Sequence, residues 1–129
     1  MRQILLYMFW VVAMFVPSMA HGQGAKIVFD NTLHNFDIVR EEGGTVSHDF
    51  VFTNTGDAAL VVVEVNTNCG CTVADFPQAP IAPGYSSVIT ITFDPKGNPG
   101  EFAKEIIVKT NAKKKKSRLR IKGVVFPKQ

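Results

Sequence analysis

The sequence has few of the residues that crosslink or anchor the core of a small domain. Its only cysteines are Cys69 and Cys71, and a single glycine separates them. A pair this close cannot join two sheets, so the fold must be stable without a long-range disulfide. The only tryptophan, Trp10, lies in the N-terminal apolar run, so the buried tryptophan typical of antibody domains is missing. The core must therefore consist of phenylalanine, valine and isoleucine.

Motifs that carry catalysis are also missing. The sequence has no G-x-S-x-G, no H-E-x-x-H and no phosphate-binding glycine loop. The three histidines, His21, His34 and His48, have no ligand-like spacing to the cysteines, and a stable zinc site needs about four ligands. We therefore predict a protein that is not an enzyme and holds neither a cofactor nor a metal. His48 falls among apolar positions and is predicted to be a core histidine with its polar atoms satisfied.

Residues 1–22 have the layout of a secretory signal peptide. A positive start at Arg2 precedes an uncharged apolar run over residues 4–16, and small residues follow. The run is shorter than the roughly 20 residues that a membrane-spanning helix needs. Cleavage after Ala20 or Gly22 would leave a domain without stable membrane insertion, and an uncleaved anchor is the alternative. We predict export to the periplasm or the cell exterior, which argues against nucleic-acid binding.

Apolar and polar residues alternate over most of the chain after the signal. The clearest series is Val46, His48, Phe50 and Phe52, which alternates with polar neighbours and so puts one face in a core. No window has a helical period. We predict about seven strands, near residues 26–29, 36–39, 45–53, 60–65, 88–93, 102–110 and 118–126. Such short, regularly spaced strands predict a single all-β domain over residues 26–128, an antiparallel sandwich of two sheets.

Charge is unevenly distributed along this domain. Residues 26–95 hold 2 basic and 9 acidic side chains, and residues 96–129 hold 11 basic and 2 acidic ones. Four consecutive lysines, residues 113–116, fall in the loop between the last two long strands. We interpret them as a charged hairpin tip that favours solubility, with binding of anionic sugar, phosphate or lipid as the alternative.

The last strand combines both kinds of residue. Arg118, Arg120 and Lys122 lie on one face, and Leu119 and Ile121 face the core. Basic side chains of this kind are typical of a protected sheet edge.

Asn54 and Gly56 are predicted to form one turn. The Asn54 side chain is expected to bond to the backbone, and Gly56 is expected to supply a left-handed residue.

The Cys69-Gly70-Cys71 run permits several chemistries. In an extended strand, Cα atoms two residues apart lie about 6.5–7 Å from each other, which is the limit for a disulfide, and Gly70 lets the backbone bend. So small a ring adds little stability and would be reduced easily. The pair is a structural disulfide or two packed thiols, a redox site, or a clip for a soft ion such as Cu(I). A thiol redox or Cu(I)-binding protein is therefore the alternative function.

Four short motifs occur along the chain: F-x-F-x-N-T-G (Phe50, Phe52, Asn54, Thr55, Gly56), C-G-C-T (Cys69, Gly70, Cys71, Thr72), P-x-x-P-G (Pro80, Pro83, Gly84) and G-x-F-x-K (Gly100, Phe102, Lys104). Together they resemble the domain-of-unknown-function family 1573, which is common among exported bacterial proteins. The resemblance covers about residues 26–126. Asp37 and Ala59 depart from it, because a glycine and a proline are usual there.

The resemblance implies an immunoglobulin-like sandwich similar to the major-sperm-protein and ASH type. Relatives of that type mostly act as interaction or scaffolding modules, and the family has no established activity to carry over. We therefore expect an exported binding or structural module with an unknown protein partner in the cell envelope. A sandwich offers exposed strand edges, so the expected binding mode is addition of a partner strand to one of them.

Overall fold

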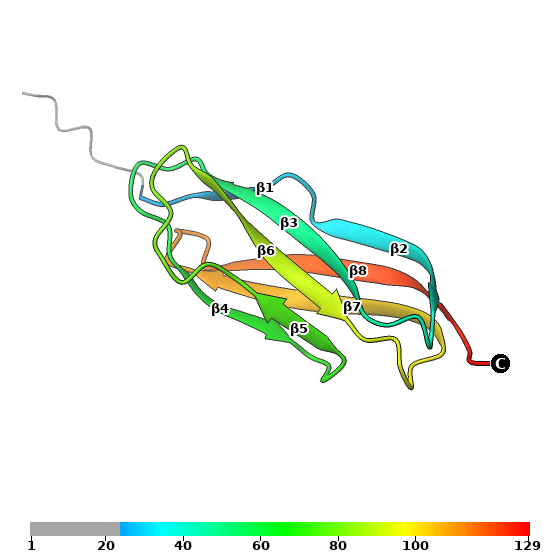
Figure 1. Ribbon diagram of the computed structural model, residues 1–129. Helices are drawn as coiled ribbons and strands as arrows, with labels where there is room; N and C mark the ends of the chain where they lie inside the picture. Colours follow the sequence, from blue (N-terminus) through cyan, green and yellow to red (C-terminus); the bar gives the residue numbers. More distant parts are fainter. Residues whose placement is uncertain (1–23) are drawn as a thin grey trace, which may run out of the picture.

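The computed structural model describes residues 24–129, which form two sheets of four strands packed face to face (Figure 1). The signal-peptide prediction lies outside the described residues. The strands are β1 (Ile27–Phe29), β2 (Leu33–Arg40), β3 (Val46–Asn54), β4 (Val62–Thr67), β5 (Thr72–Asp75), β6 (Ser86–Phe93), β7 (Gly100–Thr110) and β8 (Lys116–Phe126). No helix capable of crossing a lipid bilayer occurs within residues 24–129.

Strand order confirms the predicted sandwich. The first sheet has the order β1-β3-β6-β5, and the second has the order β2-β8-β7-β4. Seven of the strands coincide with predicted ones. The eighth, β5, was not expected, because its four residues are too few to show a period.

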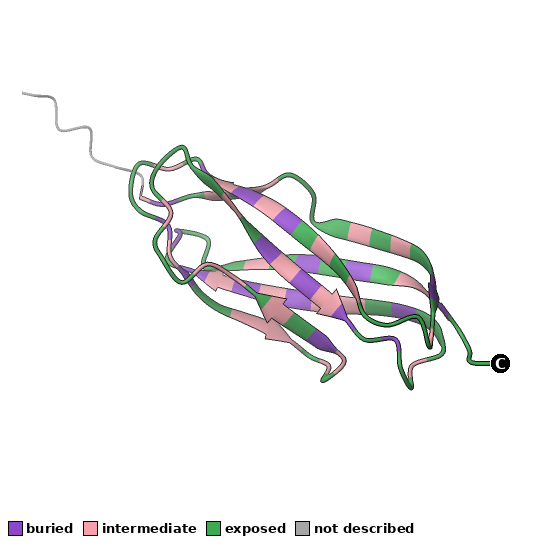
Figure 2. Ribbon diagram, in the orientation of Figure 1, coloured by how far each residue is buried: buried purple, intermediate pink, exposed green. Residues whose placement is uncertain are grey.

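The core lies between the inward faces of the two sheets, where buried residues alternate with exposed ones along each strand (Figure 2). Phe50 and Phe52 are both buried, as the alternation predicts, and so are Leu119 and Ile121. Phe102 of the second sheet stacks on Phe93 of the first, with ring centroids 4.2 Å apart. Apolar packing across the two sheets therefore stabilises the fold, as expected for a chain without a long-range disulfide.

The N-terminal part of the domain is shared between the two sheets. β1 pairs antiparallel with β3 in the first sheet, and after residues 30–32 the chain crosses to the second sheet. There β2 pairs with β8 in parallel, which is an exception to the predicted antiparallel pairing. β8 lies between β2 and β7 from Arg120 onward, so the interpretation of the basic last strand as a sheet edge is wrong there and holds only for Lys116–Leu119.

Two strands of the second sheet contain irregularities that alter which side chains face inward. In β2 the register shifts between Asn35 and Ile38, and Asp37 there has a φ of 60°. This position is one where the resemblance led us to expect glycine, and aspartate is among the few other residues that tolerate a left-handed backbone. β4 has a similar shift between Val62 and Glu64, which buries Val62 and leaves Val63 exposed.

Candidate functional site

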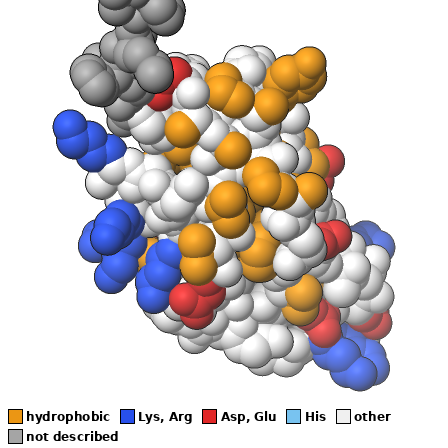
Figure 3. Space-filling model, turned by 90° about the vertical axis from the view of Figure 1, so that its left-hand side faces the viewer, with side chains coloured by type: hydrophobic (Ala, Val, Ile, Leu, Met, Phe, Trp, Pro, Cys, Tyr) orange, Lys and Arg blue, Asp and Glu red, His pale blue; other side chains and the backbone are white. Residues whose placement is uncertain are grey.

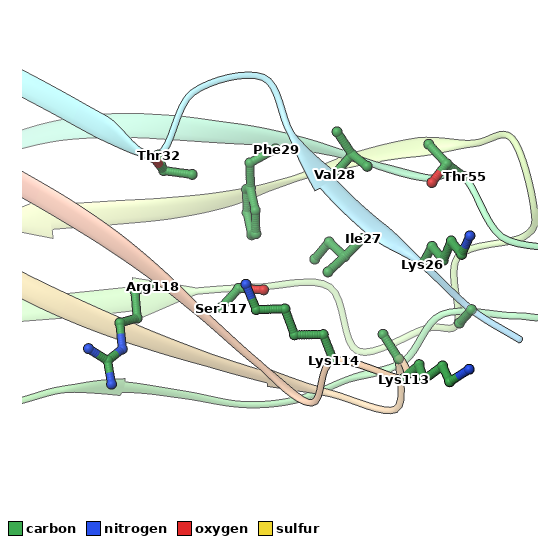
Figure 4. Close-up of a pocket in the computed structure, with 12 residues that line it drawn as sticks. Lys26, Ile27, Val28, Phe29, Thr32, Thr55, Lys113, Lys114, Ser117 and Arg118 are labelled. Carbon is green, nitrogen blue, oxygen red and sulfur yellow. The ribbon is translucent and has the colours of Figure 1, made fainter.

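A groove opens between the two sheets where the chain crosses from one to the other. It has a volume of about 650 Å³, within the usual range for ligand sites, and it lies between β1 and the β7–β8 hairpin. Ile27 and Phe29 project from β1 towards the hairpin, while Val28 projects away from it (Figure 4). Ala25 and Ala112 complete an apolar floor. We refer to this site as the seam groove.

The groove exists because β2 covers only part of β8. Pairing between them begins at Leu33 and Arg120, so the residues of β8 from Lys116 to Leu119 pair only with β7. The N–H of Arg120 donates to the carbonyl of Thr32 at 2.8 Å, which shows that Arg120 points its backbone groups to the β2 side. Backbone groups alternate in direction along a strand, so those of Arg118 and Lys116 face the same side. No described strand pairs with that side of either residue.

Lysines surround the mouth of the seam groove. Lys113 and Lys114 line it from the hairpin tip, and Lys114 extends across the opening towards Ser117 (Figure 4). Within residues 24–129, neither lysine forms an ion pair, and no aspartate or glutamate lines the groove. Figure 3 shows the same end of the molecule, with hydrophobic side chains spread over it and basic side chains near its margins. The groove is therefore apolar inside and positively charged at its mouth.

Asn111 fixes the base of the lysine hairpin. Its Oδ1 accepts a bond from the N–H of Val61 at 2.8 Å, and its Nδ2 donates to the carbonyl of Ala59 at 3.0 Å. The N–H of Asn111 also donates to the carbonyl of Val61 at 3.1 Å. These bonds hold the base of the hairpin against the segment before β4, and they thereby fix where the lysines of the hairpin lie.

Asn54 holds the opposite wall of the groove in place. Its side chain is fully buried, and Oδ1 accepts bonds from the N–H groups of Lys26 at 3.3 Å and Gly56 at 3.0 Å. Nδ2 donates to the carbonyls of Ala58 at 2.8 Å and Ile81 at 2.9 Å. The predicted turn bond exists, and the same side chain also anchors the start of β1.

Gly56 has a role different from the predicted one. Its φ is not positive, so it does not supply the left-handed residue of the turn. A Cβ atom there would overlap the carbonyl oxygen of Gly24, because the two backbones approach closely. The mutual bonds between Asp57 and Gly24, at 2.8 and 3.1 Å, reinforce this contact. Gly56 is therefore required because a side chain would displace the residues that lead into β1.

Pro83 and Gly84 form the turn that leads into β6. Gly84 has a φ of 82°, the left-handed region that favours glycine, and its N–H donates to the carbonyl of Asn54 at 2.7 Å. The N–H of Asn54 in turn donates to the carbonyl of Tyr85 at 3.0 Å. Two of the sequence motifs thus meet at one point and jointly position the end of β3.

The Cys-Gly-Cys run connects β4 of the second sheet to β5 of the first. Cys69 and Cys71 form a disulfide, with Cα atoms 5.1 Å apart, and both residues are only partly buried. Gly70 is exposed, with open space around its Cα. Thr72 follows as a buried residue, and its carbonyl accepts a bond from the Thr67 hydroxyl at 3.0 Å. The run therefore closes a bend between sheets, on elements that do not border the seam groove.

His34 and His48 are brought together by the fold. Their rings stack with centroids 3.7 Å apart and an angle of 9° between the planes, across the contact of β2 with β3. Phe36 and Phe50 pack edge-on against this pair. Partial burial, and secondarily the charge of His34, lowers the pKa of His48, while Asp49 has the opposite effect. The aromatic pairing was not predicted, because it joins residues of two different sheets.

The seam groove was also missed at the level of sequence. Its floor and its mouth come from residues 25–29 and 112–118, and nothing in the chain indicates that they meet. A partial signal existed in the short apolar run Ile27-Val28-Phe29 next to a strand interruption. The lysine run was a second partial signal, and only the fold shows that the two segments lie together.

Comparison with solved structures identifies the fold. A protein of unknown function from Porphyromonas gingivalis has a TM-score of 0.71 at 20% identity, over 85% of this chain and 51% of that one. The chain thus spans about half the length of that protein. The human CEP192 ASH/PapD-like domain 7 has a TM-score of 0.68 at 14% identity, over 89% and 95% of the two chains. The E. coli chaperone DraB has a TM-score of 0.53 at 19% identity, over 81% and 56%.

These similarities show an immunoglobulin-like sandwich and, at such identities, the fold alone. A search among curated proteins found no significant match. A family profile, by contrast, matches residues 27–125, which is nearly the whole sandwich and includes the Asn54 turn and the Cys-Gly-Cys run. The chain belongs to the family described as "Protein of unknown function (DUF1573)".

Proposed function

We propose that this protein is an exported, non-enzymatic binding module that takes up an extended segment of a protein partner in the cell envelope. The observation that carries the proposal is the uncovered edge of β8 at Lys116–Leu119, which borders the seam groove. An unpaired strand edge offers backbone donors and acceptors to an incoming strand. A neighbouring groove adds pockets for the side chains of that strand.

The other sheet edges are less suited to strand addition. β5 has only four residues, and both β2 and β4 contain register shifts that interrupt a regular ladder. The part of β3 that precedes its pairing with β1 also has an uncovered outer edge. There, however, the stacked rings of His34 and His48 occupy the space between the sheets. The start of β8 combines an open edge with an adjoining cavity.

The fold neighbours are consistent with this role. The human ASH/PapD-like domain and the chaperone DraB share the sandwich, and neither name denotes an enzyme. The described residues also bring together no group of three or more histidine, cysteine or acidic side chains that could hold a metal. Binding through a sheet edge needs no such group.

Site-specific photo-crosslinking in intact cells tests the proposal. A photoreactive amino acid at Ser117, which lines the groove, should give discrete crosslinked adducts with an envelope protein. The same amino acid at Val73, which is 64% exposed on a different sheet, should give none or much less. Equal crosslinking at both positions would contradict the proposal.

Deletion of residues 1–22, followed by cell fractionation, tests export separately, because the shortened protein should remain in the cytoplasm.

A thiol redox function is a second candidate, favoured by the formed and partly exposed Cys69–Cys71 disulfide. An insulin-reduction assay with the protein and a Cys69→Ser/Cys71→Ser double variant tests it. With dithiothreitol supplied as the electron donor, the redox function predicts that the protein speeds insulin reduction beyond dithiothreitol alone and that the variant does not. Absence of turnover by the unmodified protein would eliminate this candidate.

A further inference from the structure

We infer that the seam groove selects an extended partner segment in which acidic and apolar residues alternate. The inference rests on the proposed function and specifies the chemistry of its partner. Three features of the groove carry it: the direction of the backbone groups on β8, the apolar floor and the charge at the mouth. Each feature corresponds to one property of the bound segment.

The backbone of β8 requires an extended segment. The N–H and C=O groups of Lys116 and Arg118 point to the side that β2 leaves uncovered. A segment that pairs there continues the second sheet past the beginning of β2. Because hydrogen bonds to these groups involve only the backbone of the partner, they demand a strand conformation and specify no sequence.

The floor of the groove requires apolar side chains at every second position. Side chains of a strand alternate between its two faces, so every second residue of the bound segment would point between the sheets. There it would meet Ile27 and Phe29, which are partly buried against the core, and Ala112, which is 3% exposed. Burial of aliphatic groups against these three residues would contribute the non-directional part of the affinity.

The mouth of the groove requires negative charge on the remaining positions. Lys113 and Lys114 line it without an acidic partner among the described residues. Arg118 also lines the groove, but it lies 3.9 Å from the Glu105 carboxylate, so its charge is partly offset. The alternate side chains of the bound segment point out of the groove on the side of the lysines. Aspartate or glutamate there gains from both cations, whereas lysine is repelled.

Fluorescence anisotropy with synthetic peptides tests the inference on the purified protein. The probe is a labelled peptide of alternating aspartate and valine, about eight residues long, enough to span the uncovered edge. One control peptide has the same composition with the aspartates and valines in separate blocks. A second control alternates lysine with valine. We expect binding of the first peptide alone, accompanied by slower amide hydrogen exchange at Lys116 and Arg118.

Two charge-reversal variants locate the binding. Lys113→Glu/Lys114→Glu should weaken binding of the aspartate–valine peptide by about tenfold or more, since two attractions become repulsions. Lys122→Glu reverses a single charge on β8, outside the groove, and should weaken binding by less than about twofold. Equal losses in the two variants, or equal binding of either control peptide, would overturn the inference.

The inference would also be overturned if the seam groove binds either of two other occupants. Sedimentation analysis would identify a second copy of this chain as the occupant if the unmodified protein is a dimer and the Lys113→Glu/Lys114→Glu variant is a monomer. Decanoate, a fatty-acid anion, would identify an anionic lipid as the occupant if it displaces the peptide and if its own binding also depends on Lys113 and Lys114. If the Ser117 crosslinks form and the aspartate–valine peptide does not bind, the partner chemistry is wrong and the proposed function stands. If no groove-specific crosslink forms, the proposed function fails as well.

Discussion

Asn54 ties three segments of the chain together through one side chain. It bonds to the start of β1 at Lys26, to its own turn at Gly56 and Ala58, and to the segment before β6 at Ile81. The Asn54 side chain is fully buried, and its four bonds lie in partly buried surroundings. A buried polar group that loses its partner costs about 1–3 kcal/mol, so a side chain with this many partners has a large effect on stability.

Asn54→Ala should lower the free energy of unfolding by about 3 kcal/mol, because it removes every one of these bonds at once. Urea denaturation measures the effect. Asn111→Ala is the matched control, since it also removes an asparagine with a donor bond and an acceptor bond, but at an exposed position. A loss for Asn54→Ala no larger than that for Asn111→Ala would contradict the role assigned to the buried side chain.

Gly56 shows why sequence alone misjudged one residue of this turn. The pattern N-T-G is typical of a turn with a left-handed glycine, and it therefore predicts a positive φ at Gly56. The actual constraint is the carbonyl of Gly24, which belongs to a different segment and occupies the space of a side chain. Contacts between residues far apart in the chain leave no trace in a local pattern.

The stacked histidines join two strands of different sheets, β2 and β3. Burial lowers the pKa of His48 in the folded protein, whereas in the unfolded chain it titrates near about 6.5. The unfolded state therefore binds a proton more readily. It follows that the contribution of His48 to stability is complete above about pH 6.5 and decreases as the pH falls below that value.

Urea denaturation at about pH 7.5 and about pH 5.5 should show this dependence. The protein should lose more stability between these two conditions than a His48→Gln variant, which has no ionisable group at that position. His34 and Asp49 are present in both proteins, so the comparison isolates the substitution at His48. Equal pH dependence of protein and variant would show that His48 does not report on the contact between β2 and β3.

Glu41 connects three parts of the chain at the opposite end of β2. Its carboxylate accepts bonds from the N–H groups of Lys128 at 3.0 Å and Gly97 at 2.9 Å, which lower its pKa. The stabilising form is the carboxylate, so these contacts persist above the ordinary pKa of glutamate and are lost as the pH falls through the acid range.

Glu41→Ala should speed amide hydrogen exchange at both Gly97 and Lys128, because it removes the two acceptor oxygens that these N–H groups use. Two-dimensional NMR measures both rates. Amide hydrogen exchange at Glu64 and Lys109, an ion pair between β4 and β7, should stay unchanged, since these residues lie on other strands. Unaltered exchange at Gly97 and Lys128 would exclude the bridging role of Glu41.

Whole-molecule stability depends on apolar packing between the sheets. The single disulfide closes a ring over residues 69–71, which constrains the unfolded chain by about 1.5 kcal/mol at most in a chain-entropy estimate. Reductant should therefore leave the circular dichroism spectrum β-rich, with only a small decrease in the midpoint of thermal unfolding. The Cys69→Ser/Cys71→Ser variant should behave like the reduced protein. Unfolding on reduction would refute the view that the core suffices.

The sandwich itself was predictable because period two is strong in seven strands. Phe50, Phe52, Leu119 and Ile121 all face the core as the alternation indicates. The parallel pairing of β2 with β8 was not predictable, because it follows from the crossing between sheets at residues 30–32. The seam groove depends on that same crossing, so the candidate site was hidden for the same physical reason.

The parallel pair β2–β8 also determines how the domain responds to mechanical tension. Force applied at Leu33 and Phe126 pulls the two strands lengthwise past each other, so all their hydrogen bonds are loaded simultaneously. Force applied at Gly100 and Phe126 instead peels the β7–β8 hairpin open one bond at a time. In single-molecule pulling, rupture should need greater force in the first geometry than in the second. The resistance of the domain to stretching should therefore depend on the direction of pulling and be greatest along β2 and β8.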